Sequence, residues 1–242
     1  MSYYLNLSIL SNDDDNPLLN KQDNLRKTEH KKRLSAEARH ILSRCEGRPI
    51  AEEDIAGDTP WGRPFFPGRD TDFSISHSGN LAAVSLVRGK NQRTGCDVEL
   101  VRPRPRAKEI AEEFFTAPER GYIESQGRFD GTRFFQIWTL KECFLKLRGL
   151  SVFDMPNAPS FICDEGQCRG RFFFSVSGAF PISFNLYELS GAGERYILAT
   201  ALEGTEIEQP EIRWFSQGSA DCKSIANIKA APSPAETVRP KI

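Results

Sequence analysis

Acidic side chains on two different elements of secondary structure constrain this chain more than any other feature. Residues 95–99 are Gly-Cys-Asp-Val-Glu within an apolar, β-prone segment, and residues 138–142 are Trp-Thr-Leu-Lys-Glu. Because alternate residues of a strand point to the same face, Asp97 and Glu99 project together. Clustered like charges are unfavourable unless a cation lies among them. A third carboxylate from Glu142 would complete an oxygen-rich site, and Mg²⁺ is the first hypothesis because it retains waters and accepts substrate phosphates.

The segment that carries Glu142 has the clearest helical pattern in the chain. From Gly131, apolar residues recur at helical spacing until Gly149 ends the helix. Glu142 follows Trp138 by four positions and Lys146 follows Glu142 by four, so the three side chains share one face. An exposed Glu–Lys pair at this spacing only stabilises a helix, but the apolar neighbours mark this face as the edge of a core. Charged groups there need partners, which the strand carboxylates and a cation would supply.

A histidine at the end of a short predicted strand, residues 72–77, offers a group for phosphate binding. His77 is preceded by Ser76 and followed by Ser78 and Gly79, a setting whose hydroxyl and backbone N–H groups suit an anion. A purely structural histidine is the alternative. Three cations could join the same patch, namely Arg63, Lys141 and Lys146. With a divalent ion, these groups favour phosphoryl-type chemistry, which needs positioning and charge neutralisation but no covalent intermediate.

Several common motifs and functions are excluded or not indicated. The sequence contains no glycine-rich Walker loop, no Gly-x-Gly-x-x-Gly and no Gly-x-Ser-x-Gly. Its 32 basic and 33 acidic residues nearly cancel to a net charge of −1, which does not indicate nucleic-acid binding. No apolar run approaches the roughly 18–20 residues that cross a bilayer, and the first residues lack a signal-peptide pattern. Six scattered cysteines without nearby histidines favour reduced thiols, so we expect a cytoplasmic protein that does not bind membranes.

Strands and helices alternate along the chain, which predicts an α+β fold. Before a hinge at Pro103 and Pro105, the pattern predicts a strand, a basic helix, a Pro/Gly-rich loop, a short strand and a hairpin, at residues 3–10, 21–42, 57–68, 72–77 and 81–101. After the hinge it predicts three helices and then four strands, at residues 108–115, from 116, 131–149, 172–176, 182–189, 196–202 and 212–215. The lack of periodicity from residue 226 predicts a disordered tail over residues 226–242.

Three motifs, taken in this order, resemble the Sfp-type 4'-phosphopantetheinyl transferases. They are Phe-Ser-Ile-Ser-His-Ser-Gly at residues 73–79, the acidic strand at residues 95–99, and the helix motif that runs from Trp138 through Lys146 to Gly149. The loop Gly-Arg-Pro-Phe at residues 62–65 is also similar to the family's glycine-basic-proline loop. The acidic strand, followed by Arg-Pro-Arg, is most similar to the bacterial holo-acyl-carrier-protein synthase-like branch. The chain departs from the family at Cys143, where alanine or serine is usual, and in lacking a second glycine after Gly149.

The resemblance implies a pseudo-twofold 4'-phosphopantetheinyl transferase fold of two similar α+β halves, with coenzyme A held between them. We expect the N-terminal half at residues 1–102 and the C-terminal half at residues 103–225. The implied Mg²⁺ ligands are Asp97, Glu99 and Glu142, and the implied catalytic groups are Glu142, Lys146 and His77. The implied contacts to coenzyme A come from Arg33, Arg39, Arg63, Ser76, His77, Lys141 and Lys146.

The implied reaction is Mg²⁺-dependent transfer of phosphopantetheine from coenzyme A to a serine of an apo acyl or peptidyl carrier protein. It would release adenosine 3',5'-bisphosphate and would serve fatty acid, polyketide or nonribosomal peptide biosynthesis. Glu142 is the candidate general base, directly or through a metal-bound water. Carrier proteins are acidic as a class, so we expect a basic and apolar docking surface. Phe114, Phe115 and the segment after Gly149 are its candidates, unless both phenylalanines fill the core, and a monomer would suffice.

Two other functions stay open at this point. A metal-dependent nuclease is suggested by Asp-x-Glu with a nearby lysine and glutamate. That arrangement places its Glu-x-Lys on a strand, however, whereas Lys141 and Glu142 lie on a strongly periodic helix. The second alternative is a non-catalytic module that binds coenzyme A or a carrier protein. A pure binding module has no need to keep three carboxylates together, which argues against it.

Overall fold

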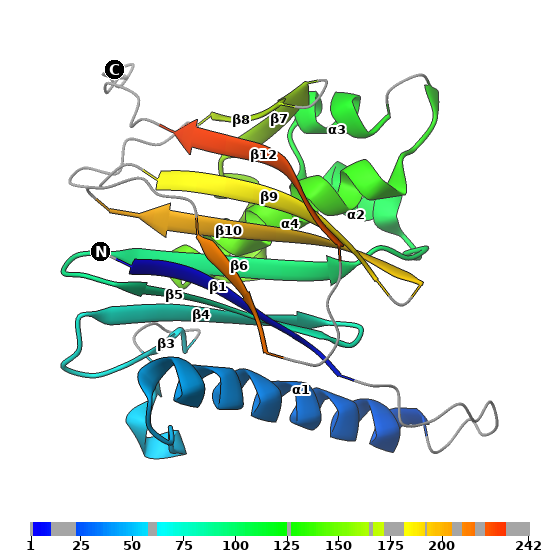
Figure 1. Cartoon of the computed structure of the whole chain (residues 1–242). Helices are drawn as coiled ribbons and strands as arrows, with labels where there is room; N and C mark the ends of the chain where they lie inside the picture. Colours follow the sequence, from blue (N-terminus) through cyan, green and yellow to red (C-terminus); the bar gives the residue numbers. More distant parts are fainter. Residues whose placement is uncertain are drawn as a thin grey trace.

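Two four-stranded sheets form the framework of the molecule (Figure 1). The computed structural model describes residues 2–10, 23–57, 62–124, 127–164, 167–171, 182–191, 193–204, 210–215 and 221–230. Within these ranges the strand orders are β11-β1-β5-β4 and β12-β9-β10-β6, and helices cover the sheets. The α+β fold class predicted from the sequence is therefore confirmed. No helix in this described part of the chain is long and apolar enough to cross a membrane.

A long helix covers the first sheet. The elements are β11 (Glu211–Trp214), β1 (Ser2–Ile9), β5 (Leu81–Arg88), β4 (Thr71–Ser78) and the helix α1 (Asp23–Glu46). β1 pairs antiparallel with β5 and parallel with β11, and β4 and β5 form a hairpin. Leu34, Ala38 and Ile41 recur at helical spacing along α1 and form one apolar cluster with Phe73 and Leu86 of the sheet. Figure 1 shows α1 running beneath this sheet, so the helix fixes one side of any site on β4.

One helix, α4 (Gly131–Arg148), packs on the second sheet, and two further helices, α2 (Ala107–Phe114) and α3 (Ala117–Ile123), pack against α4. The strands are β12 (Asp221–Ala230), β9 (Ile182–Gly191), β10 (Glu194–Glu203) and β6 (Arg93–Leu100). All neighbouring strands are antiparallel. Asp130 caps the start of α4 by accepting hydrogen bonds from the backbone N–H groups of Thr132 and Arg133. Gly149 ends the helix in the left-handed region at φ 66°, as the sequence predicted.

Short strands and 3-10 helices connect these larger elements. They are η1 (Glu52–Asp54), the pairs β2 (Ala56–Gly57) with β3 (Pro64–Phe65) and β7 (Ser160–Asp164) with β8 (Gln167–Arg171), and the 3-10 helix η3 (Val152–Asn157). A separate apolar cluster joins the faces of the two sheets that point away from the helices. It combines Leu5 and Leu7 of β1 with Tyr187 of β9 and Leu198 of β10. The helices therefore lie outside and the two sheets pack against each other.

The predicted hairpin over residues 81–101 is wrong. Both edges of β5 are occupied, by β1 and by β4, so β6 leaves the first sheet and pairs with β10. Conversely, β11 comes from the second half of the sequence but pairs with β1 at the edge of the first sheet. The two sheets thus exchange strands across the division expected at residue 102.

The predicted disordered tail begins too early. Residues 226–230 complete β12, which pairs with β9. A register shift between Ser224 and Ala226 interrupts this strand, and such a bulge breaks the alternation from which a strand is predicted. The strand predicted at residues 172–176 and the rest of the predicted tail, residues 231–242, lie outside the described residues.

Candidate active site

Serine side chains join the two sheets where β4 and β6 run side by side and parallel. The hydroxyl oxygens of Ser74, Ser76 and Ser78 accept hydrogen bonds from the backbone N–H groups of Cys96, Val98 and Leu100, at 3.1, 3.2 and 3.0 Å. Alternate residues of β4 point to the same side, so one strand can present all three hydroxyls. These serines, which we call the serine seam, supply the hydrogen bonds that a backbone ladder would otherwise make. The seam therefore sets the spacing between the strand of His77 and the strand of the carboxylates.

A glycine lets α4 lie directly against β6. A Cβ atom at Gly95 would lie 2.4 Å from the carbonyl oxygen of Cys143 and 3.0 Å from Cβ of Leu147. The contact with the carbonyl oxygen is too short for a real Cβ atom, and the contact with Leu147 is tight, so glycine permits this close approach of helix and strand. The approach brings Glu142 and Lys146 of α4 to the same cavity as the β6 carboxylates.

Asp97 is bound by a charged partner and a neutral one. Its Oδ1 accepts hydrogen bonds from Lys146 Nζ at 2.7 Å and from Ser76 Oγ at 2.8 Å, and Lys146 Nζ also donates to Ser76 Oγ at 2.8 Å. With the Val98 N–H, the Ser76 hydroxyl uses its one proton and both lone pairs. Asp97 is 5% exposed, so this network fixes a buried carboxylate at the base of the cavity.

Glu99 is held by neutral donors from two elements. Ser78 Oγ donates to Oε2 at 3.0 Å, and Trp138 Nε1 donates to Oε1 at 3.1 Å. The guanidinium of Arg104 lies 3.9 Å from Oε1, which is beyond hydrogen-bond distance. Both carboxylate oxygens of Glu99 therefore have a fixed hydrogen-bond donor.

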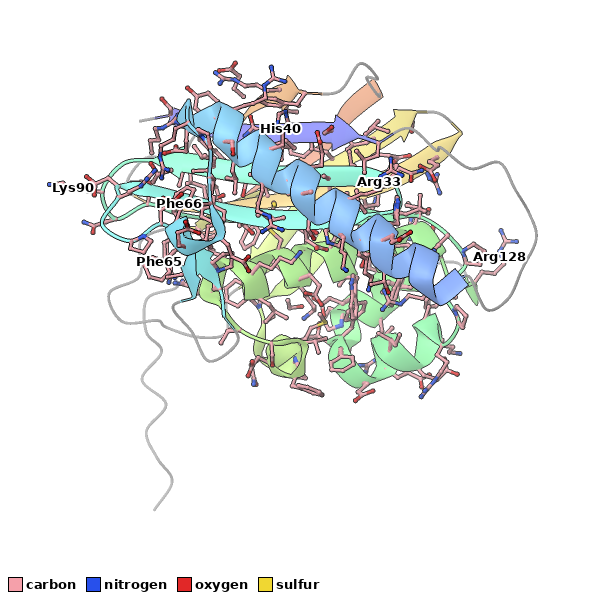
Figure 2. All side chains as sticks on the ribbon, turned by 90° about the horizontal axis from the view of Figure 1, so that it is seen from below. Arg33, His40, Phe65, Phe66, Lys90 and Arg128 are labelled. Carbon is pink, nitrogen blue, oxygen red and sulfur yellow. The ribbon has the colours of Figure 1, made fainter. Side chains whose placement is uncertain are left out.

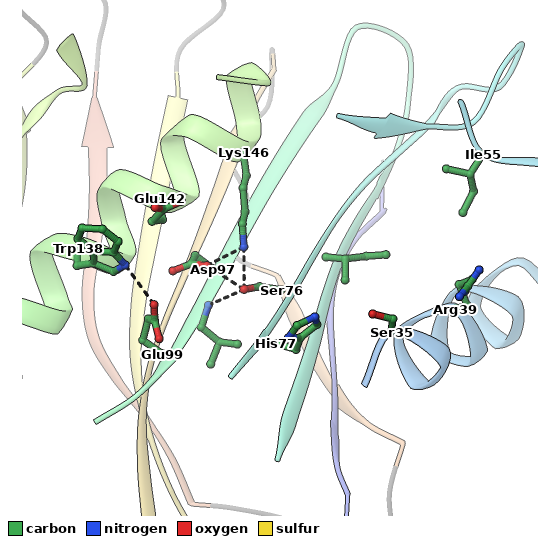
Figure 3. A pocket seen from close by; sticks show the side chains of 12 residues that line it. Ser35, Arg39, Ile55, Ser76, His77, Asp97, Glu99, Trp138, Glu142 and Lys146 are labelled. Atoms are coloured by element: carbon green, nitrogen blue, oxygen red, sulfur yellow. Dashed lines mark hydrogen bonds and ion pairs between the residues drawn. The ribbon is translucent and has the colours of Figure 1, made fainter. Parts of the chain in front are cut away.

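These side chains line one cavity of about 490 Å³ between α1, β4, β6 and α4 (Figure 3). Seven of the residues predicted for the site line it together: Arg39, Ser76, His77, Asp97, Glu99, Glu142 and Lys146. Figure 3 shows Glu142 and Lys146 on the helix above the two strand carboxylates, with His77 between them and α1. The groups predicted to bind a metal and those predicted to bind phosphate thus meet in one place.

The cavity is short of positive charge. Burial, together with the nearby charge of Asp97, raises the pKa of Glu142 from 4.5 to about 7 and also raises the pKa of Glu99. Burial lowers the pKa of His77, and the charge of Lys146 lowers it further. Burial alone would lower the pKa of Lys146, but the negative charge of Asp97 outweighs it and raises this pKa. Three carboxylates thus share the cavity with two cationic side chains, Lys146 and Arg39, and an added cation would relieve the repulsion among the acids.

The donor set suits a hard divalent cation, although the side chains are not arranged around one. Among the described residues, no three acidic, histidine or cysteine side chains converge closely enough to surround an ion. Oδ2 of Asp97 is buried and makes no hydrogen bond within the same described ranges. A buried, orphaned carboxylate oxygen beside two further carboxylates is the chemistry that Mg²⁺ binds. The residues present therefore fit such an ion in the chemistry of their donor atoms.

Lys141 does not reach the cavity. Its side chain is fully buried, forms an ion pair with Glu119 at 3.2 Å and donates to the carbonyl oxygen of Pro159 at 3.4 Å. Glu119 also accepts hydrogen bonds from the backbone N–H groups of Thr116 and Phe161, so the pair ties α3 and β7 to α4. One residue advances about 100° around a helix, which turns Lys141 away from the face of Glu142. The predicted contact of Lys141 with coenzyme A has no support in this geometry.

Arg63 also has a different place from the one predicted. It donates to both carboxylate oxygens of Asp72, at 3.0 and 2.6 Å, and to the carbonyl oxygens of Thr94 and Lys146, at 3.1 and 3.0 Å. Its side chain is 4% exposed and borders a neighbouring cavity of about 210 Å³ that Lys146 shares. Arg63 thus binds the loop before β4 to β4, β6 and the last turn of α4. The sequence offered no sign that Asp72 would be its partner.

The basic helix α1 contributes only part of what was predicted. Arg39 lines the cavity together with Ser35, which the sequence analysis did not identify. Arg33 is exposed and is not among the lining residues, and Figure 2 shows it further along α1. His30 Nε2 lies 2.7 Å from the carbonyl oxygen of Gly79 and anchors the helix over the turn that follows His77. No pattern in the sequence distinguished His30 from the surrounding polar residues.

The fold and the cavity define an α+β protein with an acidic, lysine-flanked site between two helix-covered sheets. Residues 93–201 match the model of the 4'-phosphopantetheinyl transferase superfamily. AcpT, a 4'-phosphopantetheinyl transferase of Salmonella typhi, is 32% identical over 113 residues, which are 45% of this chain and 58% of AcpT. The 4'-phosphopantetheinyl transferase psf-1 of Bacillus pumilus is 31% identical over 137 residues, 55% of this chain and 56% of psf-1. A Synechocystis protein provisionally given the same name is 32% identical over 168 residues, 64% of this chain and 65% of that protein.

These comparisons agree with the resemblance found in the sequence. The matched region contains β6 and α4, and therefore Asp97, Glu99, Glu142 and Lys146. The chain spans 56–65% of the length of these three relatives. The resemblance predicted from the three motifs is confirmed, since residues 93–201 match the model of the 4'-phosphopantetheinyl transferase superfamily.

Proposed function

We propose that this protein transfers 4'-phosphopantetheine from coenzyme A to a serine of an apo acyl or peptidyl carrier protein. The observation that carries the proposal is the single cavity in which Asp97, Glu99 and Glu142 meet His77 and Lys146. A pyrophosphate is negatively charged, so the three carboxylates would repel it unless a divalent cation lay between them. Mg²⁺ held by the three carboxylates would supply charge neutralisation at the pyrophosphate oxygens.

The cations and the histidine of the cavity would hold the donor. Lys146 lines two cavities and its side chain is 32% exposed, so its ammonium group can donate to a phosphate oxygen while it remains beside Asp97. His77, whose pKa is lowered, can donate one hydrogen bond as a neutral imidazole. Arg39 reaches the same cavity from α1 and would bind a further phosphate.

Glu142 is the candidate group that takes the proton of the attacking serine. Burial raises the pKa of this carboxyl group in the metal-free site, and a cation bound to it would lower the pKa again. The proton would therefore pass to Glu142 directly or through a metal-bound water. The proton would move from the serine hydroxyl to a Glu142 carboxylate oxygen while the pyrophosphate bond breaks. Adenosine 3',5'-bisphosphate is the leaving group.

Of the candidates for the carrier docking surface, the segment after α4 is better placed than the two phenylalanines. Phe115 is 4% exposed and packs against Phe134 and Trp138, and Phe114 packs on the same cluster, so both serve the core. Within the described ranges, the large apolar side chains that are exposed are Leu150 and Phe153, at 40% and 78%. They follow Gly149 directly, in the segment expected to contact the carrier.

The two alternative functions receive less support from the geometry. A nuclease of the Asp-x-Glu type would need Lys141 in the site, but Lys141 is buried against Glu119. A module that only binds would gain nothing from a buried Asp97 beside two carboxylates with raised pKa values. The transferase proposal uses all three acids.

The test incubates the full chain with coenzyme A, Mg²⁺ and apo carrier proteins from fatty acid, polyketide and peptide synthesis. The intact mass of a substrate carrier should rise by one phosphopantetheine, with formation of adenosine 3',5'-bisphosphate. The absence of both products with every carrier would contradict the proposal. A serine-to-alanine carrier is the matched control, because it keeps the docking surface and lacks the acceptor hydroxyl.

A further inference from the structure

Both carboxylate oxygens of Glu99 accept a hydrogen bond, although the side chain is partly exposed and could be hydrated instead. One carboxylate oxygen is bound by Ser78 of β4 and the other by Trp138 of α4, at 3.0 and 3.1 Å. These donors come from elements that lie on different sides of β6. Both hydrogen bonds join two side chains, so neither belongs to the backbone hydrogen bonding of the sheet or of the helix.

The direction of the Ser78 hydroxyl is fixed by the serine seam. Its oxygen accepts the backbone N–H of Leu100 at 3.0 Å, so its only proton is left for Glu99. Ser76 is arranged in the same way toward Asp97. Ser74 accepts the backbone N–H of Cys96 in the same seam and lies beside no carboxylate of the site. The seam therefore contains one residue that holds the strands and two that also hold acids.

The indole of Trp138 is equally restrained. Its ring stacks on Phe134 with centroids 6.0 Å apart and an interplanar angle of 19°, and it contacts Phe115 at 6.5 Å. The guanidinium of Arg104 covers it at 4.4 Å. Trp138 is 7% exposed, so Nε1 cannot turn away from Glu99 without displacing the core.

We propose that Ser78 and Trp138 are positioning residues that hold the Glu99 carboxylate at the cavity, where it would serve as a ligand of a divalent cation. This inference rests on the proposed function, because it takes Glu99 as a metal ligand. Each donor occupies one lone pair on a different oxygen and leaves the remaining lone pairs for an ion. Both donors are neutral, so they fix the carboxylate without cancelling its charge. Asp97 differs, because Lys146 already neutralises one of its oxygens.

The expected effect is weaker metal binding with an intact fold. Groups that orient metal ligands typically change metal affinity by about 10–100-fold when they are removed, so we expect a loss of about tenfold in Ser78→Ala. Ser78→Thr keeps the hydroxyl and should restore most of the affinity. Trp138→Phe removes the N–H donor and keeps an aromatic side chain of smaller volume at this position, so it should also weaken binding.

Ser74→Ala is the matched control. It removes a seam hydrogen bond of the same kind as Ser78→Ala, to the N–H of Cys96 instead of Leu100. Both alanine variants should lower the melting temperature, Ser78→Ala by more, because it also loses the hydrogen bond to Glu99. Ser74→Ala should bind the metal as the wild type does, which separates the loss of a seam bond from the loss of a carboxylate donor.

The test measures Mn²⁺ binding to the full chain by electron paramagnetic resonance, with Mg²⁺ as competitor and without carrier protein. Support requires weaker binding in Ser78→Ala and in Trp138→Phe, with binding unchanged in Ser74→Ala. Wild-type affinity in both Ser78→Ala and Trp138→Phe overturns the inference and leaves the metal site of the proposed function intact. Absence of Mn²⁺ binding in the wild type overturns the metal assignment itself and the inference with it. If Ser78→Ala fails to fold, Trp138→Phe and Ser78→Thr decide the question.

Discussion

Replacing Glu142 by glutamine should stabilise the metal-free protein at alkaline pH. Glu142 lies beside Asp97 and Glu99, and its pKa is raised from 4.5 to about 7 by burial and then by the charge of Asp97. The folded state therefore holds this proton more tightly than the unfolded chain does. Glutamine has a similar shape and no charge, so the variant removes the repulsion and keeps the volume.

The sign and size of the effect follow from that difference in pKa. Below pH 4.5 the group is protonated in both states, and its raised pKa costs nothing. As the pH rises from 4.5 to about 7, the unfolded chain releases the proton first, so the free energy of unfolding falls, and the loss is complete above pH 7. At 1.36 kcal/mol per pKa unit the ceiling is about 3 kcal/mol, and partial exposure of Glu142 reduces this to about 1–2 kcal/mol.

Urea unfolding at pH 5 and pH 8, with a chelator present, measures this change. Glu142→Gln should gain about 1–2 kcal/mol over the wild type at pH 8 and much less at pH 5. Glu113→Gln, at an exposed position of α2, is the control and should shift neither value. Added Mg²⁺ should stabilise the wild type and not Glu142→Gln. A variant that is less stable than the wild type at pH 8, or a difference that does not change with pH, would refute the reasoning.

Three further substitutions test how the site is supported. Arg63→Lys loses the two-point contact with Asp72 in a buried setting and should cost about 2–3 kcal/mol by urea unfolding. Arg48→Lys, in the more exposed pair with Asp54, should cost less than about 1 kcal/mol, and equal losses would contradict the burial argument. Lys141→Ala leaves Glu119 charged and buried, so unfolding should become easier by about 3–5 kcal/mol; an unchanged stability with a raised KM for coenzyme A would instead restore Lys141 to the binding site. Gly95→Ala should destabilise the fold by about 1–3 kcal/mol, because the new Cβ atom meets the backbone of α4. Gly131→Ala is the control, because its Cβ atom would have no neighbour within 4 Å. Similar unfolding curves for the two variants would show that β6 and α4 are not in close contact.

The extent of the helices and the meeting of the main acidic groups could be predicted from the sequence. Helical spacing alone put Glu142 and Lys146 on the face of Trp138, and alternation alone put Asp97 and Glu99 on one side of a strand. Both are local rules, and in the structure all four charged residues line one cavity. The strand and helix had only to be packed together, which Gly95 permits.

What could not be predicted depends on contacts between distant segments. No local pattern states that β5 will be occupied on both edges, so β6 was assigned to the wrong neighbour. Lys141 was expected in the site because its motif is there, but its partner Glu119 lies on α3, on another side of α4. Arg63 was expected to face a ligand, and Asp72 takes its guanidinium instead. The serine seam was visible as alternating serines, but its role depends on the nearness of β6.

The most direct test of the account compares wild type and Asp97→Ala in the carrier-modification assay. Apo carrier protein, coenzyme A and Mg²⁺ are incubated with each, and the intact mass of the carrier is recorded. The account predicts one added phosphopantetheine with the wild type, and none with Asp97→Ala under conditions where circular dichroism shows that the variant is folded. Modification by Asp97→Ala at a rate near that of the wild type would contradict it, and so would an unchanged carrier mass with the wild type.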